Sequence, residues 1–229
     1  MYPIIVLSFT GLFTLFLGLD NPKSKTILPG TVLFLLVALC SNFLDWNAPG
    51  TYFNNMIEVN NPNIIVGTLI ILSTLLLVLL SAGQFEDEQA HPAEYYALMQ
   101  FSVVGALIMA TFNNLLMLFL GLEILSIALY VLTGSDKTNL RGNEAALKYF
   151  LMGSFATGIL LFGVAMIYGA TGSFEIHGGT TLALAAPSSK IFFYVGIVFT
   201  LIGLLFKISG APFHFWTADV YQGAPTIFT

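Results

Sequence analysis

Long apolar runs, separated by short polar links, occupy most of the chain from its first residues onward. A helix needs about 20 consecutive, mainly apolar residues to cross a bilayer. By this measure the pattern predicts seven spanning helices, at Tyr2–Leu19, Ile27–Leu44, Asn63–Ala82, Tyr95–Phe112, Asn113–Leu132, Asn143–Ala170 and from Ser189 to at least Ile208. Another apolar run begins near Pro225, close to the last residue, Thr229. We therefore expect the start of an eighth helix and a natural chain that continues.

The stretch between the second and third runs, Asp45–Asn61, is too polar to span. It contains Pro-Gly and Asn-Asn pairs, which are typical of turns, beside large apolar residues such as Tyr52 and Ile57. It is compatible with an interfacial segment or with a short hairpin. The single cysteine, Cys40, lies in the second apolar run and is predicted to be a small core residue. One cysteine cannot form an internal disulfide and offers no metal-binding or redox spacing.

The composition narrows the class of protein: 57% of the 229 residues are hydrophobic and only 8% are charged. In soluble domains, roughly a quarter of the residues are charged. A soluble globular enzyme and a disordered chain are therefore excluded, and the formal net charge of −5 argues against a nucleic-acid partner. The N-terminal run lacks a basic leading stretch and a clear cleavage site, so we expect it to remain as a helix. We predict an all-α, polytopic transmembrane bundle in contact with the lipid bilayer.

The basic residues of the links predict the orientation. Lys23, Lys25, Lys137 and Arg141 lie in links that follow odd-numbered spans, whereas only Lys190 lies in a link after an even-numbered span. Cytoplasmic loops are enriched in lysine and arginine. We therefore place the odd-numbered links in the cytoplasm and the N-terminus outside.

Three charged residues, Glu123, Lys148 and Lys207, fall inside predicted spans, besides Glu144 and Lys190 at the very start of theirs. A charged side chain at the bilayer centre costs about 3 kcal/mol or more, so such residues by default indicate a path for ions or protons. Glu123 lies in the middle of its span, and Ser126 and Tyr130 share its helical face at positions +3 and +7. The alternative for Glu123 is a protonated structural carboxyl bonded to a neighbouring helix.

The two lysines leave alternatives open. Lys148 lies near the start of its span, where its stem can reach the interface and Glu144 is a partner one turn earlier. Lys207 ends an apolar run just before Pro212, which should break the helix because proline lacks an amide proton and clashes with the carbonyl four residues earlier. Freed carbonyl groups beside a lysine suit a proton-handling site. The alternative for Lys207 is a lysine that reaches the cytoplasm from the helix end.

After the expected break come His214, Trp216 and Asp219. Histidine titrates closest to physiological pH, so His214 can pass protons between the Lys207 region and water, or it can be an interfacial hydrogen-bonded residue. Trp216 is predicted to lie in the aromatic belt of the membrane interface. Asp219 is predicted to cap a local helix.

At this point several motifs carry a resemblance. The chain from about Asn63 onward resembles the subunit N family, the antiporter-like chain 2, of proton-translocating NADH–quinone oxidoreductase, respiratory complex I. The motifs that carry it are Gly121–Ser126, Asn143–Phe150, Phe206–Trp216 and Asp219–Thr226. Two positions, Ala218 and Ile227, depart from the usual pattern, in which proline is expected, and both flank the turn before the eighth helix.

The resemblance implies a chain of about 14 spans, built from two inverted five-helix repeats, of which this sequence covers about half. It implies one integral membrane domain, in which residues 1–90 form leading helices 1–3 and residues 91–229 form most of the first repeat, with a discontinuous helix 7. It makes Glu123 the glutamate that couples to the neighbouring subunit and Lys207 the lysine of the broken helix. It also favours Lys148 and His214 as members of a polar axis for proton transfer.

The resemblance further implies a non-redox subunit that moves protons when quinone is reduced elsewhere in the complex. We expect no cofactor or metal on this chain, with NADH, FMN, iron–sulfur clusters and quinone bound by other subunits. Its partners would be other membrane subunits, especially homologous antiporter-like ones, in a bacterial plasma (inner) membrane. A subunit of a multi-subunit cation/proton antiporter and a purely structural membrane subunit remain as alternatives.

Overall fold

The structure is a computed structural model and describes residues 1–20, 26–83, 92–176 and 187–228. Its helices are, in chain order, α1 (Tyr2–Asp20), α2 (Ile27–Asn42), α3 (Asn61–Leu80), α4 (Pro92–Thr111), α5 (Leu115–Thr133), α6 (Leu140–Thr171), α8 (Pro187–Lys207) and α9 (Thr217–Gly223). Short 3-10 turns follow at Phe43–Asp45, Ser81–Gly83 and Thr226–Phe228. Within the described ranges, seven helices are long and apolar enough to span a membrane, which confirms the predicted bundle.

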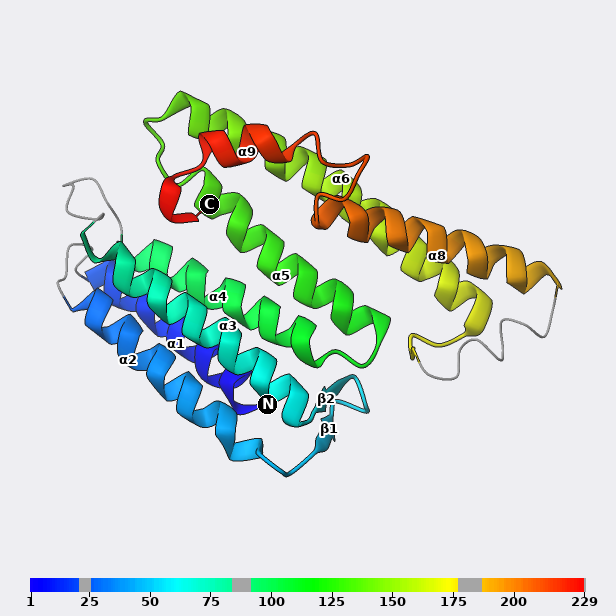
Figure 1. The fold of residues 1–229 in the computed structure, drawn as a ribbon, viewed down its shortest axis with the longest axis horizontal. Coiled ribbons are helices and arrows are strands. Elements are labelled where there is room, and N and C mark those ends of the chain that lie inside the picture. Colours follow the sequence, from blue (N-terminus) through cyan, green and yellow to red (C-terminus); the bar gives the residue numbers. More distant parts are fainter. Residues whose placement is uncertain (21–25, 84–91, 177–186, 229) are drawn as a thin grey trace.

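The helices form two groups (Figure 1). In the first, α1 packs against both α2 and α4, α3 packs against α2 and α4, and α5 lies along α4. In the second, α6 and α8 pack along each other, and α9 lies over α6. Because α5 also contacts α6, it joins the two groups. The main apolar core lies in the first group, around Leu7, Leu35, Ile71 and Tyr96.

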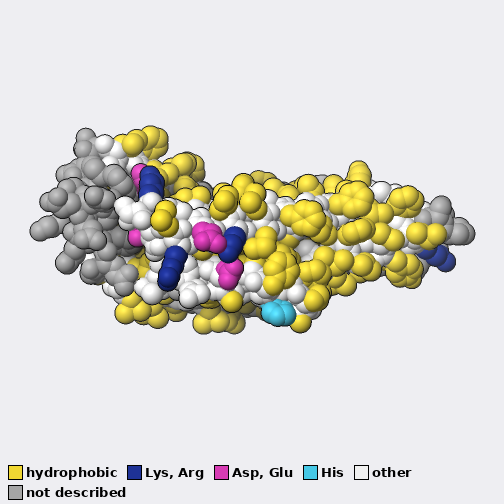
Figure 2. Space-filling model, turned by 90° about the horizontal axis from the view of Figure 1, so that it is seen from above, with side chains coloured by type: hydrophobic (Ala, Val, Ile, Leu, Met, Phe, Trp, Pro, Cys, Tyr) yellow, Lys and Arg dark blue, Asp and Glu magenta, His cyan; other side chains and the backbone are white. Residues whose placement is uncertain are grey.

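The outer surface is apolar over most of its area. Figure 2 shows one long face on which hydrophobic side chains predominate and most of the visible charged side chains gather toward one end. Lipid chains can solvate such a surface, whereas its exposure to water would be energetically unfavourable.

Asparagine side chains set the start of three spanning helices. Asn60, Asn114 and Asn139 each accept hydrogen bonds from backbone N–H groups in the first turn of α3, α5 and α6. Such N-caps are worth about 1 kcal/mol each because they satisfy donors that the helix leaves unpaired. The predicted starts of these helices differ from the observed ones by two or three residues, because apolarity alone does not locate a polar cap.

The segment between α2 and α3 is a hairpin, which decides the alternative left open by the sequence. Strands β1 (Gly50–Tyr52) and β2 (Ile57–Val59) pair in antiparallel register. Ile57 also forms a β-bridge with Phe112, and the Asn113 N–H donates to the Met56 carbonyl at 2.9 Å. The hairpin therefore fastens the link between α4 and α5.

Cys40 is exposed on the outer face of α2, so its assignment to the core was wrong. The buried positions of this helix, Thr31, Leu35, Ala38 and Asn42, follow the helical repeat of three to four residues. Position 40 falls on the opposite side. An apolar run alone does not separate these two sides, because the lipid face is as apolar as the core.

The break predicted at Pro212 is present. Helix α8 ends at Lys207, Ser209 has a positive φ of 56°, and regular helix resumes only with α9 at Thr217. Helices α8 and α9 thus form one discontinuous helix, with α8 as its first part and the short α9 as its second. Lys207 lies at the end of its first part, next to the carbonyl groups that the break releases.

Candidate functional site

The structure brings Glu123 and Lys207 together between α5 and α8. The Lys207 Nζ lies 3.7 Å from Glu123 Oε1 and donates to Ser126 Oγ at 2.9 Å and to Tyr130 Oη at 3.0 Å. The Lys207 side chain is 11% exposed and that of Glu123 is 24% exposed. The ammonium group therefore has two neutral hydroxyl partners at direct hydrogen-bond distance and one carboxylate farther away.

Each member of this group is positioned by local structure. Glu123, Ser126 and Tyr130 lie on one face of α5, as the spacing of three and four residues predicted. Lys207 is the last residue of α8, where the negative end of the helix dipole favours a cation. The break after α8 thus places a cation opposite the polar face of α5.

Glycine at position 153 makes room for Tyr130. A Cβ added to Gly153 of α6 would collide with the Tyr130 hydroxyl and would lie 2.7 Å from Tyr130 Cζ. The Tyr130 ring also packs edge-on against Tyr149, with 4.6 Å between centroids. Helix α6 therefore determines where the Tyr130 hydroxyl meets Lys207.

Thr157 of α6 completes this partly buried group. Its hydroxyl donates to Glu123 Oε1 at 2.8 Å, and the residue is 8% exposed. Sequence reasoning missed Thr157. The available signal was a polar residue one helical turn after Gly153, but recognising its role requires knowing which face of α6 contacts α5.

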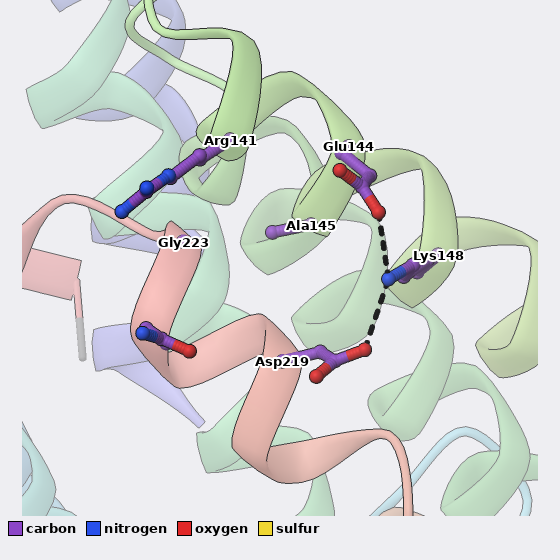
Figure 3. A pocket seen from close by; sticks show the side chains of 7 residues that line it. Arg141, Glu144, Ala145, Lys148, Asp219 and Gly223 are labelled. Atoms are coloured by element: carbon purple, nitrogen blue, oxygen red, sulfur yellow. Dashed lines mark hydrogen bonds and ion pairs between the residues drawn. The ribbon is translucent and has the colours of Figure 1, made fainter.

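Lys148 lies in a different environment, with no direct contact to Glu123 or Lys207 among the described residues. Its Nζ contacts Glu144 Oε1 at 2.8 Å and Asp219 Oδ2 at 2.9 Å, and its side chain is 41% exposed. The Glu144 partner is the one expected from the sequence. Asp219 was expected to be a helix cap, but its carboxylate instead points across from α9 to Lys148 (Figure 3).

These ion pairs line an open hollow of about 250 Å³ between α6 and α9. The lining residues are Arg141, Glu144, Ala145, Lys148, Asp219, Gln222 and Gly223. Figure 3 shows the Lys148 ammonium between the two carboxylates, one from each helix. The hollow can admit water to charged groups that can take up and release protons.

Aromatic rings connect the two lysine environments. Trp216 is buried and stacks on Tyr149 at 4.9 Å and on Phe206 at 5.5 Å, while its indole N–H donates to the Phe206 carbonyl at 3.3 Å. The prediction that Trp216 lies in the interfacial belt is therefore wrong. Tyr149 follows Lys148 on α6 and contacts Tyr130, the partner of Lys207. The stacked rings form an apolar layer at this position.

His214 lies in the link between α8 and α9, with its side chain exposed. Its carbonyl accepts a hydrogen bond from the Thr217 N–H, and the structure does not bring its ring to Lys207. In the described ranges, no group of three or more His, Cys, Asp and Glu residues is arranged to hold a metal ion.

Comparison with known proteins gives a consistent result. The sequence profile described as "NADH:quinone oxidoreductase/Mrp antiporter, TM" matches residues 112–229. NADH-quinone oxidoreductase subunit N of Flavobacterium johnsoniae is 44% identical over 229 residues, which cover 100% of this chain and 49% of that protein. The chain spans about half the length of the curated relatives it matches.

Solved structures show the same fold. A chain of respiratory complex I from Thermus thermophilus superposes with a TM-score of 0.80 at 33% identity, over 99% of this chain and 48% of that chain. A chain of the Mrp complex from Dietzia sp. superposes with a TM-score of 0.78 at 20% identity, over 99% and 44%. The second match shows a shared fold alone.

Proposed function

The chain belongs to the NADH:quinone oxidoreductase/Mrp antiporter membrane family, and on this premise we propose that it is a proton-translocating subunit of an NADH–quinone oxidoreductase. In this proposal the chain performs no redox chemistry. NADH, FMN, iron–sulfur clusters and quinone act in other subunits, and quinone reduction there drives proton movement here. The identity of 44% to a subunit N supports this assignment.

The partly buried pair of Glu123 and Lys207 carries the proposal. Two unit charges about 4 Å apart interact by about 4 kcal/mol at an effective dielectric constant of 20. While the Glu123 carboxylate stays at 3.7 Å, it stabilises the protonated form of Lys207. When a neighbouring subunit draws Glu123 away, Lys207 loses this stabilisation and releases its proton. The Ser126 and Tyr130 hydroxyls, which already accept hydrogen bonds from Lys207, are the first groups able to relay it.

Lys148 and His214 have outer roles in this proposal. Lys148 and its two carboxylate partners face the open hollow, where protons from water enter the path. His214 is exposed beside the break and exchanges protons with the aqueous side. Both act before or after the central step, so water can partly replace them.

The remaining assignments follow the family. We place residues 1–90 as leading helices and residues 91–229 as most of the first repeat. Homologous antiporter-like subunits are the expected neighbours in a bacterial inner membrane. The N-terminus is placed outside on the basis of loop lysines, two of which, Lys23 and Lys25, lie outside the described residues.

Glu123→Gln tests the proposal in the full natural protein, assembled in its own membrane. Gln keeps the shape but removes the charge, so we expect NADH-driven proton pumping to fall by at least about tenfold, the effect of 1.4 kcal/mol. Pumping is measured as acidification of inverted vesicles and normalised to assembled complex. The matched control is Glu94→Gln, an exposed carboxyl in the first turn of α4. Unchanged pumping in Glu123→Gln would refute the proposal and favour a purely structural subunit.

A cation/proton antiporter subunit is the second candidate, because the family description also names the Mrp antiporter. Deletion of the gene separates the two functions. Loss of membrane NADH oxidation supports the oxidoreductase. Loss of sodium tolerance with intact NADH oxidation supports the antiporter.

A further inference from the structure

Thr157 differs from the other buried threonines in the part of the chain that the structure describes. Six others donate their hydroxyl to the carbonyl four residues earlier in their own helix, namely Thr14, Thr31, Thr111, Thr133, Thr171 and Thr200. This local bond is the usual one for threonine in a helix. The Thr157 hydroxyl instead reaches from α6 to α5 and donates to Glu123 at 2.8 Å.

We propose that Thr157 is a positioning residue that holds the Glu123 carboxylate short of direct contact with Lys207. This inference rests on the function proposed above. The same oxygen, Glu123 Oε1, lies 2.8 Å from the Thr157 hydroxyl and 3.7 Å from the Lys207 ammonium. Direct hydrogen bonds between ammonium and carboxylate groups are about 2.7–2.9 Å long. The threonine bond therefore anchors the same carboxylate oxygen that Lys207 would have to approach more closely in a tight ion pair.

Keeping the pair loose matters for proton transfer. In a tight pair the carboxylate would hold the protonated lysine, and the proton would leave slowly. In the observed arrangement the ammonium group directs its short bonds to the neutral hydroxyls of Ser126 and Tyr130. A neutral oxygen binds an ammonium less strongly than a carboxylate does. Thr157 thus leaves Lys207 charged but able to release its proton.

The role proposed for Thr157 depends on its hydroxyl group rather than on the shape of its side chain. Thr157 is buried, so water has little access to replace its hydrogen bond to Glu123. Valine has nearly the same shape without the hydroxyl, whereas serine keeps the hydroxyl and loses a methyl group. The two substitutions separate positioning of Glu123 from helix packing.

The experiment compares Thr157→Val, Thr157→Ser and the control Thr133→Val in the full natural protein, in its own membrane. Thr133 is also buried, on α5, and its hydroxyl donates to the Leu129 carbonyl of the same helix. NADH-driven proton pumping is normalised to assembled complex. A hydrogen bond to a charged group is strong enough that we expect Thr157→Val to slow pumping by about tenfold. We expect Thr157→Ser to restore most of this loss and Thr133→Val to resemble the wild type.

Combination with Glu123→Gln tests whether Thr157 acts through the carboxylate. The valine substitution should add little once the charge of Glu123 is gone. Equal rates for Thr157→Val and Thr133→Val, no rescue by serine, or a fully additive double variant would each overturn the inference. If Thr157→Val lowers the amount of assembled complex, Thr157→Ala provides the second hydroxyl-free variant for the same comparison. Normal pumping in Glu123→Gln alone would instead refute the proposed function.

Discussion

Two lysines of this chain, Lys207 and Lys148, have opposite surroundings. Lys207 is nearly buried, bonds two neutral hydroxyls and keeps its carboxylate at 3.7 Å. Lys148 is partly exposed and contacts two carboxylates directly, at 2.8 and 2.9 Å. The buried lysine therefore has the looser ion pair and the exposed lysine has the tighter ones.

This difference in surroundings indicates that the two lysines have different roles. An exposed ion pair is screened by water and salt and is worth about 0–1 kcal/mol, so the loss of one partner changes little. A buried charge interacts more strongly with its neighbours, so a small displacement of a partner changes its protonation. The central site is therefore the one at which the movement of a partner can switch protonation.

The largest expected effect separates the two lysines directly. We expect Lys207→Met to lower NADH-driven proton pumping by at least about tenfold, because it removes the proton carrier and leaves Glu123 without its cation. The same substitution at Lys148 should lower pumping only about twofold, since water in the hollow can still deliver protons. Both rates are measured in inverted vesicles and normalised to assembled complex. A larger loss at Lys148 than at Lys207 would reverse the assignment of the two sites.

A smaller effect is expected from Gly153→Ala, which changes the central site without touching a charge. The new Cβ would collide with Tyr130 and move its hydroxyl away from Lys207. Because Ser126 still binds the ammonium group, we expect a net loss of about 0.7–1.4 kcal/mol, a slowing of about three- to tenfold. The matched control is Gly158→Ala on the same helix, where an added Cβ meets no atom within 4 Å. Equal pumping by the two alanine variants would show that Tyr130 is not needed beside Lys207.

Much of the central site could be predicted from the sequence, because its parts are local. The helical repeat places Ser126 and Tyr130 on the face of Glu123, and Pro212 explains why the helix ends beside Lys207. Both inferences need only the geometry of one helix. Neither inference depends on how the surrounding helices pack.

The contacts between helices could not be predicted in the same way. Thr157 and Gly153 matter because of the rotation of α6 relative to α5, and Asp219 contacts Lys148 only because α9 folds back over α6. The errors for Cys40 and Trp216 have a related cause. In a membrane protein the lipid-facing and core-facing sides are both apolar, so hydrophobicity does not reveal which side a residue faces.

The smallest expected effect concerns the outer site. Asp219→Asn removes one of two carboxylates at Lys148 but leaves Glu144 in contact at 2.8 Å. Because the pair is exposed, we expect pumping to change by less than about twofold. The difference between variant and wild type should shrink as the salt concentration rises, because the Debye length becomes shorter. The measurement is the pumping rate of variant and wild type from low to high ionic strength. A loss of tenfold or more that persists at high salt would show that the outer ion pairs perform the switching assigned here to Glu123 and Lys207.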